Sequence, residues 1–251
     1  MSGHSKWSTI KRAKGAADAR RGQMFTKLAK EIMLAVRDGG PSPEQNYRLR
    51  LVMQKCKDAN MPSENIERAI RRASGESGGA AMVEATFEGY ASGGVAVLVQ
   101  VVTDNRNRTL QDIRNIFSRG NGSMAEAGAV AWMFEAKGVV TVEAAGSEAE
   151  DIALSAIDAG AEDVKIESGF LEVYTTPDSL ESVRESLEHL GAAISSAEVS
   201  MLPNTTLQLD EEDARRVLKL LDRLEEMDDV QKVYSNVDFS EEVLARLQAQ
   251  A

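Results

Sequence analysis

The spacing of apolar residues changes at one point along this chain, and that change separates two kinds of structure. Before residue 75 apolar side chains recur every three or four positions, which is the repeat of one face of a helix. After residue 81 they alternate with polar side chains or form short continuous runs, which is typical of strands. The segment Ser74 to Ala81 between them holds three glycines and predicts a flexible linker. We therefore expect a helical domain followed by sheet-containing domains.

The N-terminal third predicts three amphipathic helices. The first covers Ala17 to Asp38 and ends at Gly39-Gly40. Ser42-Pro43 is expected to start the second, because proline is favoured at the first helical position. Pro62-Ser63 starts the third. Helices of this length and patterning make a small bundle, which we assign to residues 1–75.

The remaining chain predicts two ferredoxin-like domains. Residues 136–203 follow the order strand–helix–strand–strand–helix–strand, which is the ferredoxin-like split βαβ arrangement. Elements before and after this segment would complete a second sheet, so 136–203 is expected to be inserted into a discontinuous domain of residues 82–135 plus 204–240. The fold class expected is α+β, an N-terminal helical bundle plus two ferredoxin-like α/β domains, one inserted in the other.

The individual elements of this part are predicted from period and turn residues. Strands are expected at Met82–Phe87, Val95–Val102, Val130–Phe134, Val139–Val142, Val164–Ile166, Phe170–Tyr174, Ala192–Met201, Thr205–Leu209 and Val230–Asp238, and helices at Thr109–Arg119, Glu148–Ala159, Pro177–Leu190 and Glu211–Met227.

Charge is distributed very unevenly over these parts. The net charge of the chain is −11, which by itself argues against a polyanionic partner. Residues 1–75, however, carry 16 Lys or Arg against 7 Asp or Glu, a net charge of +9, whereas residues 76–251 carry 13 against 33, a net charge of −20. One basic module on an acidic chain is the pattern expected of a protein that contacts nucleic acid through that module. Accidental clustering on a solvated face is the alternative.

Several other classes of protein are disfavoured. No run of about 18 apolar residues is present, so no membrane span is expected, and no signal peptide is indicated. The basic start before Asp18 faintly resembles a transit peptide, but it leads directly into a basic helix, and we expect a cytoplasmic location. A single cysteine, Cys56, excludes an intramolecular disulfide. With only His4 and His189 besides, no metal site and no cofactor are expected.

Enzyme motifs are also missing: the chain contains no G-x-G-x-x-G, Walker A, H-E-x-x-H or G-x-S-x-G. Cys56 shares the apolar stripe of its helix and is expected in the core. His189 lies near a helix C-terminus, where an imidazolium suits the helix dipole. The acidic run Asp210 to Asp213 is expected to start a helix and to pair at i,i+4 with Arg215 and Arg216, rather than to bind metal. We therefore expect a protein without catalytic activity or a small-molecule substrate.

The basic N-terminal end is the first candidate for a nucleic-acid site. Its cationic residues fall mostly outside the apolar stripe of the first helix, so they can face a phosphate backbone together and gain from counterion release. Trp7 could stack on a base or anchor the tail to the bundle. The candidate residues here are His4, Lys6, Trp7, Lys11, Arg12, Lys14, Arg20, Arg21, Lys27 and Lys30.

The segment Asp104 to Thr109 is the second candidate. It lies between a central strand and the start of a helix, where free backbone N–H groups, Arg106 and Arg108 would suit a phosphate. Turn and cap chemistry from Asp104 and the neighbouring asparagines is the alternative.

Five motifs give the chain a strong resemblance to one family. They are GHSKWSTIKRAKGAADARRGQMFTKLAKEI (3–32), RLRLVMQKCKDANMPSENIERAI (48–70), EGYASGGVAVLVQVVTDNRNRT (88–109), VAWMFEAKGVV (130–140) and DAGAEDV (158–164). Together they resemble the YebC/PmpR family, which includes the mitochondrial translational activator of cytochrome c oxidase. The resemblance covers nearly the whole chain and implies three domains and a cytoplasmic, non-catalytic regulator. Residues 41–47 (PSPEQNY) and 123–129 (SMAEAGA) depart from the family pattern.

Two functions are compatible with this resemblance. One is a DNA-binding transcriptional regulator, although no helix-turn-helix with an evident reading helix is present. The other is a translational activator associated with ribosomal RNA or the ribosome, which relieves stalling on difficult sequences such as proline runs. Shape and backbone contacts suffice for that role. An enzyme of unrecognised class is the third and weakest hypothesis.

Overall fold

The structure is a computed structural model that describes residues 17–75, 82–144, 146–167 and 169–240, together with 243 and 246. The chain forms two compact units. Residues 132–206 make one, which we call the inserted unit, and the described residues before and after them make the other, the larger unit. No helix within the described ranges is long and apolar enough to cross a membrane.

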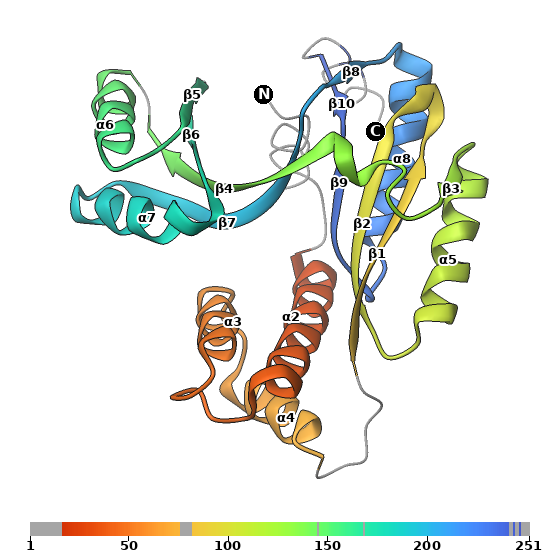
Figure 1. The fold of residues 1–251 in the computed structure, drawn as a ribbon, viewed down its shortest axis with the longest axis horizontal. Coiled ribbons are helices and arrows are strands. Elements are labelled where there is room, and N and C mark those ends of the chain that lie inside the picture. Colours follow the sequence, from red (N-terminus) through yellow and green to blue (C-terminus); the bar gives the residue numbers. More distant parts are fainter. Residues whose placement is uncertain are drawn as a thin grey trace. The chain divides into compact units, whose positions relative to one another are not determined.

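The larger unit begins with three helices, α2 (Ala17–Gly39), α3 (Tyr47–Asp58) and α4 (Ser63–Ala73) (Figure 1). The first helix packs against the other two through the predicted apolar stripes. It ends where predicted, because Gly40 adopts a φ of +83° that favours glycine and donates its N–H to the carbonyl of Val36. The buried core of this bundle consists of Leu28, Ile32, Ala35, Val36, Leu49, Val52, Cys56, Met61, Ile66 and Ala69.

The start of α3 corrects the prediction at Pro43. The helix begins at Tyr47, and its N-cap is Asn46, whose side-chain oxygen accepts the N–H of Leu49 at 3.0 Å. The Asn46 amide also donates to the carbonyls of Ala35 at 2.7 Å and Gly40 at 2.8 Å, so this buried side chain closes the turn after α2. Three satisfied hydrogen bonds outweigh the positional preference of proline.

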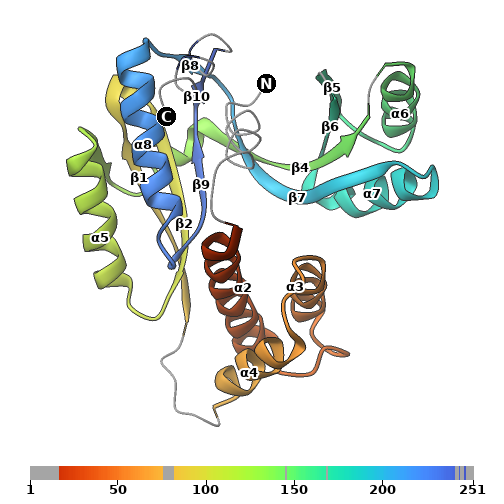
Figure 2. The same ribbon diagram turned by 180° about the vertical axis from the view of Figure 1, so that it is seen from behind.

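The same unit continues with an antiparallel sheet of order β3-β1-β2-β9. Its strands are β1 (Val83–Tyr90), β2 (Ala96–Thr103), β3 (Ser123–Ala125) and β9 (Val230–Ser235). Helices α5 (Arg106–Arg119) and α8 (Glu211–Glu225) cover one face of the sheet (Figure 2). Their buried residues, including Phe117 and Leu220, join those of β2 and β9 in one core. Two short strands, β8 (Leu207–Gln208) and β10 (Val237–Asp238), pair in parallel.

The inserted unit has the order predicted for residues 136–203. Its elements are β4 (Phe134–Glu143), α6 (Ser147–Asp158), β5 (Asp163–Glu167), β6 (Phe170–Thr175), α7 (Leu180–His189) and β7 (Ala193–Pro203). The strands form an antiparallel sheet of order β5-β6-β4-β7, which is the ferredoxin-like order, and both helices share one core with it. The α+β class with N-terminal helices is therefore confirmed, while the three-domain boundaries stay a prediction.

Two strand predictions were wrong in detail, and one strand was missed. Residues 131–133 form a 3₁₀ turn and β4 starts only at Phe134, because the N–H groups of Val130 and Ala131 donate to the carboxylate of Glu88 instead of a strand. The strand expected at Val230–Asp238 is broken at Asn236, whose side chain accepts the N–H of Ala96 at 2.9 Å. The three-residue strand β3 was not predicted at all.

Candidate nucleic-acid interface

The residues predicted to contact nucleic acid fall into two groups. His4, Lys6, Trp7, Lys11, Arg12 and Lys14 lie outside the described residues. Arg20 belongs to the first turn of α2, and Arg21, which follows it, has an exposed side chain. The structure gives the surroundings of four further candidates, Lys27, Lys30, Arg106 and Arg108.

Lys27 reaches the C-terminal end of α8, and Lys30 reaches the turn that follows it. The ammonium of Lys27 donates to the carbonyl of Glu225 at 2.7 Å, and that of Lys30 donates to the carbonyl of Asp228 at 2.9 Å. Gln23, one turn earlier on α2, also donates to Glu225 at 3.2 Å. The last carbonyls of a helix lack partners within the helix and carry its partial negative charge, so cationic side chains stabilise them. The polar face of α2 therefore joins the helical bundle to the α/β part of the larger unit.

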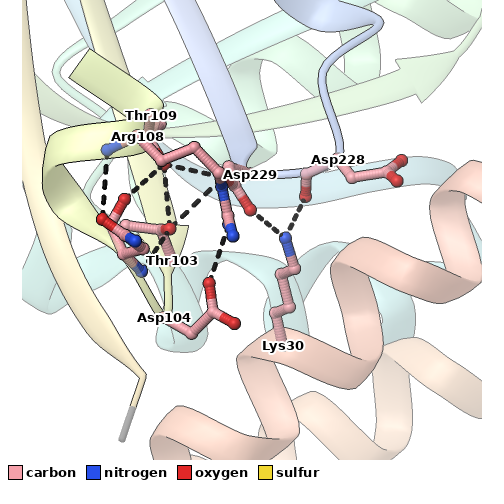
Figure 3. Close-up of polar contacts among 8 residues, drawn as sticks. Lys30, Thr103, Asp104, Arg108, Thr109, Asp228 and Asp229 are labelled. Atoms are coloured by element: carbon pink, nitrogen blue, oxygen red, sulfur yellow. Dashed lines mark hydrogen bonds and ion pairs between the residues drawn. The ribbon is translucent and has the colours of Figure 1, made fainter. Parts of the chain in front are cut away.

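Asp229 lies at the centre of a polar cluster built around this junction (Figure 3). Its carboxylate forms an ion pair with Lys30 and accepts hydrogen bonds from Thr109 at 2.6 Å and Thr103 at 3.2 Å. The guanidinium of Arg108 donates to Asp229 at 3.2 Å and to Asp104 at 2.7 Å. One carboxylate thus joins four parts of the chain that are far apart in sequence: α2, the end of β2, the start of α5 and the turn before β9.

The pKa of Asp229 reflects these contacts. Burial of the carboxyl group raises it, but the hydrogen bonds from Lys30, Thr109 and Arg108 and the charge of Lys30 favour the ionised form more strongly, and the pKa falls to about 2. The same contacts raise the pKa of Arg108, through its hydrogen bonds to Asp229 and Asp104. Asp229 is therefore ionised at any physiological pH. It neutralises Lys30 and Arg108, two cations that were predicted from the sequence to contact nucleic-acid phosphates.

The segment from Asp104 to Thr109 shows the turn and cap chemistry that was the alternative there. Asn105 is the N-cap of α5 and accepts the N–H of Arg108 at 3.1 Å, while its own N–H donates to the hydroxyl of Thr103 at 3.0 Å. Arg106 is exposed, with its guanidinium carbon 5.5 Å from the centre of the Phe87 ring, a cation–π contact. The Arg106 side chain makes no hydrogen bond to any residue that the structure describes, whereas Arg108 donates to two carboxylates.

A groove beside this cluster has balanced charge. It has a volume of about 750 Å³ and runs between α5 and the end of α8. Four cationic residues line it, Lys30, Arg108, Arg119 and Arg223, together with four acidic ones, Asp112, Glu226, Asp228 and Asp229. Equal numbers of both charges give no net attraction for a polyanion.

Several residues that were expected to have structural roles are found in those roles. Cys56 is fully buried in the bundle core, and burial raises the pKa of its thiol to about 11, so it is not a thiolate nucleophile. Asp210 caps α8 by accepting the N–H of Asp213 at 2.9 Å. Glu211 and Glu212 pair with Arg215 and Arg216 one turn later, as predicted. His189 is the last residue of α7.

The buried residue Glu88 was missed by the sequence reasoning. Its carboxylate accepts the backbone N–H groups of Gly128 and Val130 at 2.7 Å and of Ala131 at 2.9 Å. Burial raises the pKa of Glu88, but these three hydrogen bonds outweigh it and the pKa is lowered. Residues 123–129, which depart from the family pattern, are therefore held to the sheet by a buried carboxylate. Asp229 was missed for the same reason, since no local pattern marks either acid as buried.

The N-terminal helices and the two sheets covered by helices define an α+β protein. Comparison with known proteins assigns it to a family. Residues 5–76 match the family model described as the TACO1/YebC protein N-terminal domain, and residues 82–237 match the model described as the TACO1/YebC second and third domain. The chain belongs to the TACO1/YebC family, which confirms the resemblance drawn from its motifs.

Two similar proteins share one name, and one similar protein has a solved structure. A probable transcriptional regulatory protein of Dehalococcoides mccartyi is 59% identical over 251 residues, which is 100% of both chains. Another of Pelotomaculum thermopropionicum is 52% identical over 96% of this chain and 100% of its own. A crystal structure of a conserved hypothetical protein from Aquifex aeolicus is similar with a TM-score of 0.82 and 46% identity, covering 92% of this chain and 96% of that chain.

Proposed function

We propose that this protein is a cytoplasmic, non-enzymatic regulator of gene expression that binds nucleic acid, as a DNA-binding transcriptional regulator. The names of its relatives support a role in regulation. The proposal includes no cofactor, no metal, no membrane and no small-molecule substrate.

The observation that carries the proposal is the separation of charge along the chain. Residues 1–75 have a net charge of +9 and the rest a net charge of −20, so a polyanion is attracted to one end of the protein and repelled by the other. Within that basic part Arg21, Lys57 and Arg72 are exposed and have no acidic partner among the residues that the structure describes. Their charges are available to phosphate.

The proposed contact residues differ in how freely they can act. Those of the basic end, His4, Lys6, Trp7, Lys11, Arg12, Lys14, Arg20 and Arg21, are proposed as the main contacts, with Arg106 as an exposed cation on α5. Lys27, Lys30 and Arg108 stay in the proposed site in a secondary role. Their intramolecular bonds to α8 and Asp229 leave less of their charge for a ligand.

Ribosomal RNA and the ribosome are the second candidate partners, which would make the protein a translational activator that relieves stalling on difficult sequences such as proline runs. Structured RNA is recognised largely through shape and backbone contacts, and no base-reading helix is required. The acidic residues 76–251 would also suit basic ribosomal proteins.

Crosslinking in cells tests the proposal and separates its two forms. The protein is crosslinked to nucleic acid by ultraviolet light, purified under denaturing conditions, and the attached nucleic acid is sequenced. Enrichment of promoter DNA supports the transcriptional form, and enrichment of ribosomal RNA replaces it with the translational one. Recovery of no nucleic acid above that of a Lys11→Glu, Arg12→Glu, Arg20→Glu, Arg21→Glu variant contradicts both forms.

A further inference from the structure

A second groove of the larger unit has the composition of a binding site for a single strand. It has a volume of about 420 Å³, within the range of small-ligand sites, and lies between α2, α4 and the start of α5. Unlike the balanced groove beside α8, it is lined by four cationic residues, Lys30, Arg68, Arg72 and Arg108, and only two acidic ones, Asp104 and Asp229.

The two acidic residues do not repel a phosphate with their full charge. Asp229 is neutralised by Lys30 and Arg108, and Asp104 accepts from Arg108. The surplus of positive charge therefore resides on Arg68 and Arg72. Arg68 pairs with Glu64 one turn away at 2.8 Å, but both side chains are more than 60% exposed, and exposed pairs of this kind are weak. A phosphate can displace that pair.

The side chains from α4 follow one face of that helix. Asn65, Arg68 and Arg72 are three and four positions apart and all line the groove. The half-buried side chain of Asn65 makes no hydrogen bond to any residue described in the structure, so its amide is available as donor and acceptor. Such a stripe offers two guanidinium groups for phosphate and one amide for a base edge.

Apolar side chains also line the groove. Phe25 and Met33 of α2 line it together with Met61 and Met82. Phe25 is only partly buried by the bundle core, and an accessible aromatic ring beside a cationic rim is the arrangement on which exposed bases stack. Paired bases in a duplex cannot present their faces in this way.

We infer that this groove binds an unpaired nucleotide of a single-stranded nucleic acid, with Arg68 and Arg72 on its phosphates and its base against Phe25. The inference rests on the proposed nucleic-acid-binding function and specifies a strand type for it. Lys30 contributes as well, because its bonds to Asp228 and Asp229 use two of its three N–H donors.

The test compares a 12-nucleotide single strand with a duplex of the same length, by fluorescence anisotropy at fixed salt. The variant Arg68→Ala, Arg72→Ala removes two groove cations, and Arg215→Ala, Arg216→Ala removes two exposed arginines from α8, outside both grooves, as the matched control. We expect the groove variant to lose about tenfold or more in single-strand affinity and less than threefold in duplex affinity. The control is expected to lose less than threefold in both. Circular dichroism checks that each variant is folded.

A photocrosslinking arm locates the base directly. A strand carrying 5-iodouracil is irradiated with the wild-type protein, and crosslinked peptides are identified by mass spectrometry. Crosslinks to the peptide containing Phe25 support the groove. Three results would overturn it. The crosslinks could map only to other peptides, the groove and control variants could lose single-strand affinity equally, or a free mononucleotide could bind as tightly as the strand. If the wild-type protein binds neither the single strand nor the duplex, the proposed function itself is contradicted. If the wild type binds the duplex but the groove variant keeps its affinity for the single strand, only the proposal for this groove is contradicted.

Discussion

Lys30 of α2 and Asp229 at the turn before β9 are 199 positions apart in sequence and form an ion pair in which their side chains are only 13% and 12% exposed. Around this pair, Lys27 donates to the end of α8, and Leu34 of α2 packs with Met82 and Val102 beside the sheet. The helical bundle is therefore fixed to the α/β part of the larger unit by both polar and apolar contacts. A basic helix that the sequence presents as a free phosphate-binding face has part of its charge committed within the protein.

The first prediction concerns Asp229→Asn. The pKa of Asp229 is about 2 in the folded protein against an ordinary value of 3.8, so its ionised form stabilises the fold at neutral pH by about 2 kcal/mol. Because the folded pKa is depressed, this stabilisation is complete above about pH 5 and is lost as the pH falls toward 2. Urea unfolding of the larger unit, followed at a series of pH values, should show the variant less stable at pH 7 and the difference shrinking in acid. Asp112→Asn, an exposed aspartate on α5, is the control. A difference independent of pH would contradict the assignment.

The second prediction concerns Glu88→Gln. The carboxylate accepts three backbone N–H groups, whereas glutamine has one oxygen and places an N–H₂ donor against one of them. A buried donor left without an acceptor costs about 1–3 kcal/mol, and the loop should open locally. Hydrogen exchange measured by mass spectrometry should therefore accelerate at residues 126–131. Since hydrogen bonding lowers the pKa of Glu88, the wild-type loop should loosen only when the pH falls below the ordinary range of a glutamate.

Glu84→Gln provides the control for that loop. Glu84 is on the same strand, but its carboxylate is 55% exposed and pairs with Arg48 at 2.5 Å on the surface. Its replacement should leave the exchange of residues 126–131 unchanged. Equal acceleration in both variants would show that loss of charge on β1, and not the buried carboxylate, controls the loop.

The third prediction concerns Cys56, the single cysteine of the chain. Its side chain is fully buried and burial raises the pKa of the thiol to about 11, so the reactive thiolate is scarce at pH 8. Labelling by a disulfide reagent should be slow in the folded protein and should become fast in urea at the transition that unfolds the bundle. Rapid labelling without denaturant would place the thiol at the surface.

Sequence periodicity predicted most of the helices and strands because they depend on local patterns. Stripes such as that of α2 and the strand–helix order of residues 136–203 are properties of neighbouring residues. The corrections at Val130 and Asn236 share a different cause, since each depends on a hydrogen bond to a residue distant in sequence, Glu88 for Val130 and Ala96 for Asn236. At Pro43 the cause is local, because the Asn46 side chain caps the helix by accepting the N–H of Leu49. The sequence identified the basic end as a candidate site but not which cations are neutralised, because Asp229 is recognisable as their partner only in the folded chain. Arg68 and Arg72 were overlooked because their groove is formed by separate helices.

Salt dependence of nucleic-acid binding tests the central proposal most directly. The affinity of the wild-type protein for a 20-base-pair DNA duplex and for a structured RNA is measured between about 50 and 300 mM salt, beside the Lys11→Glu, Arg12→Glu, Arg20→Glu, Arg21→Glu variant. If the basic end contacts about six phosphates, log K should fall with log salt at a slope of about −5 for the duplex. The variant should bind orders of magnitude more weakly and lose most of that slope, with its thermal midpoint almost unchanged. Absence of binding by the wild type at low salt, or an unchanged slope in the variant, would contradict a nucleic-acid interface at the basic end.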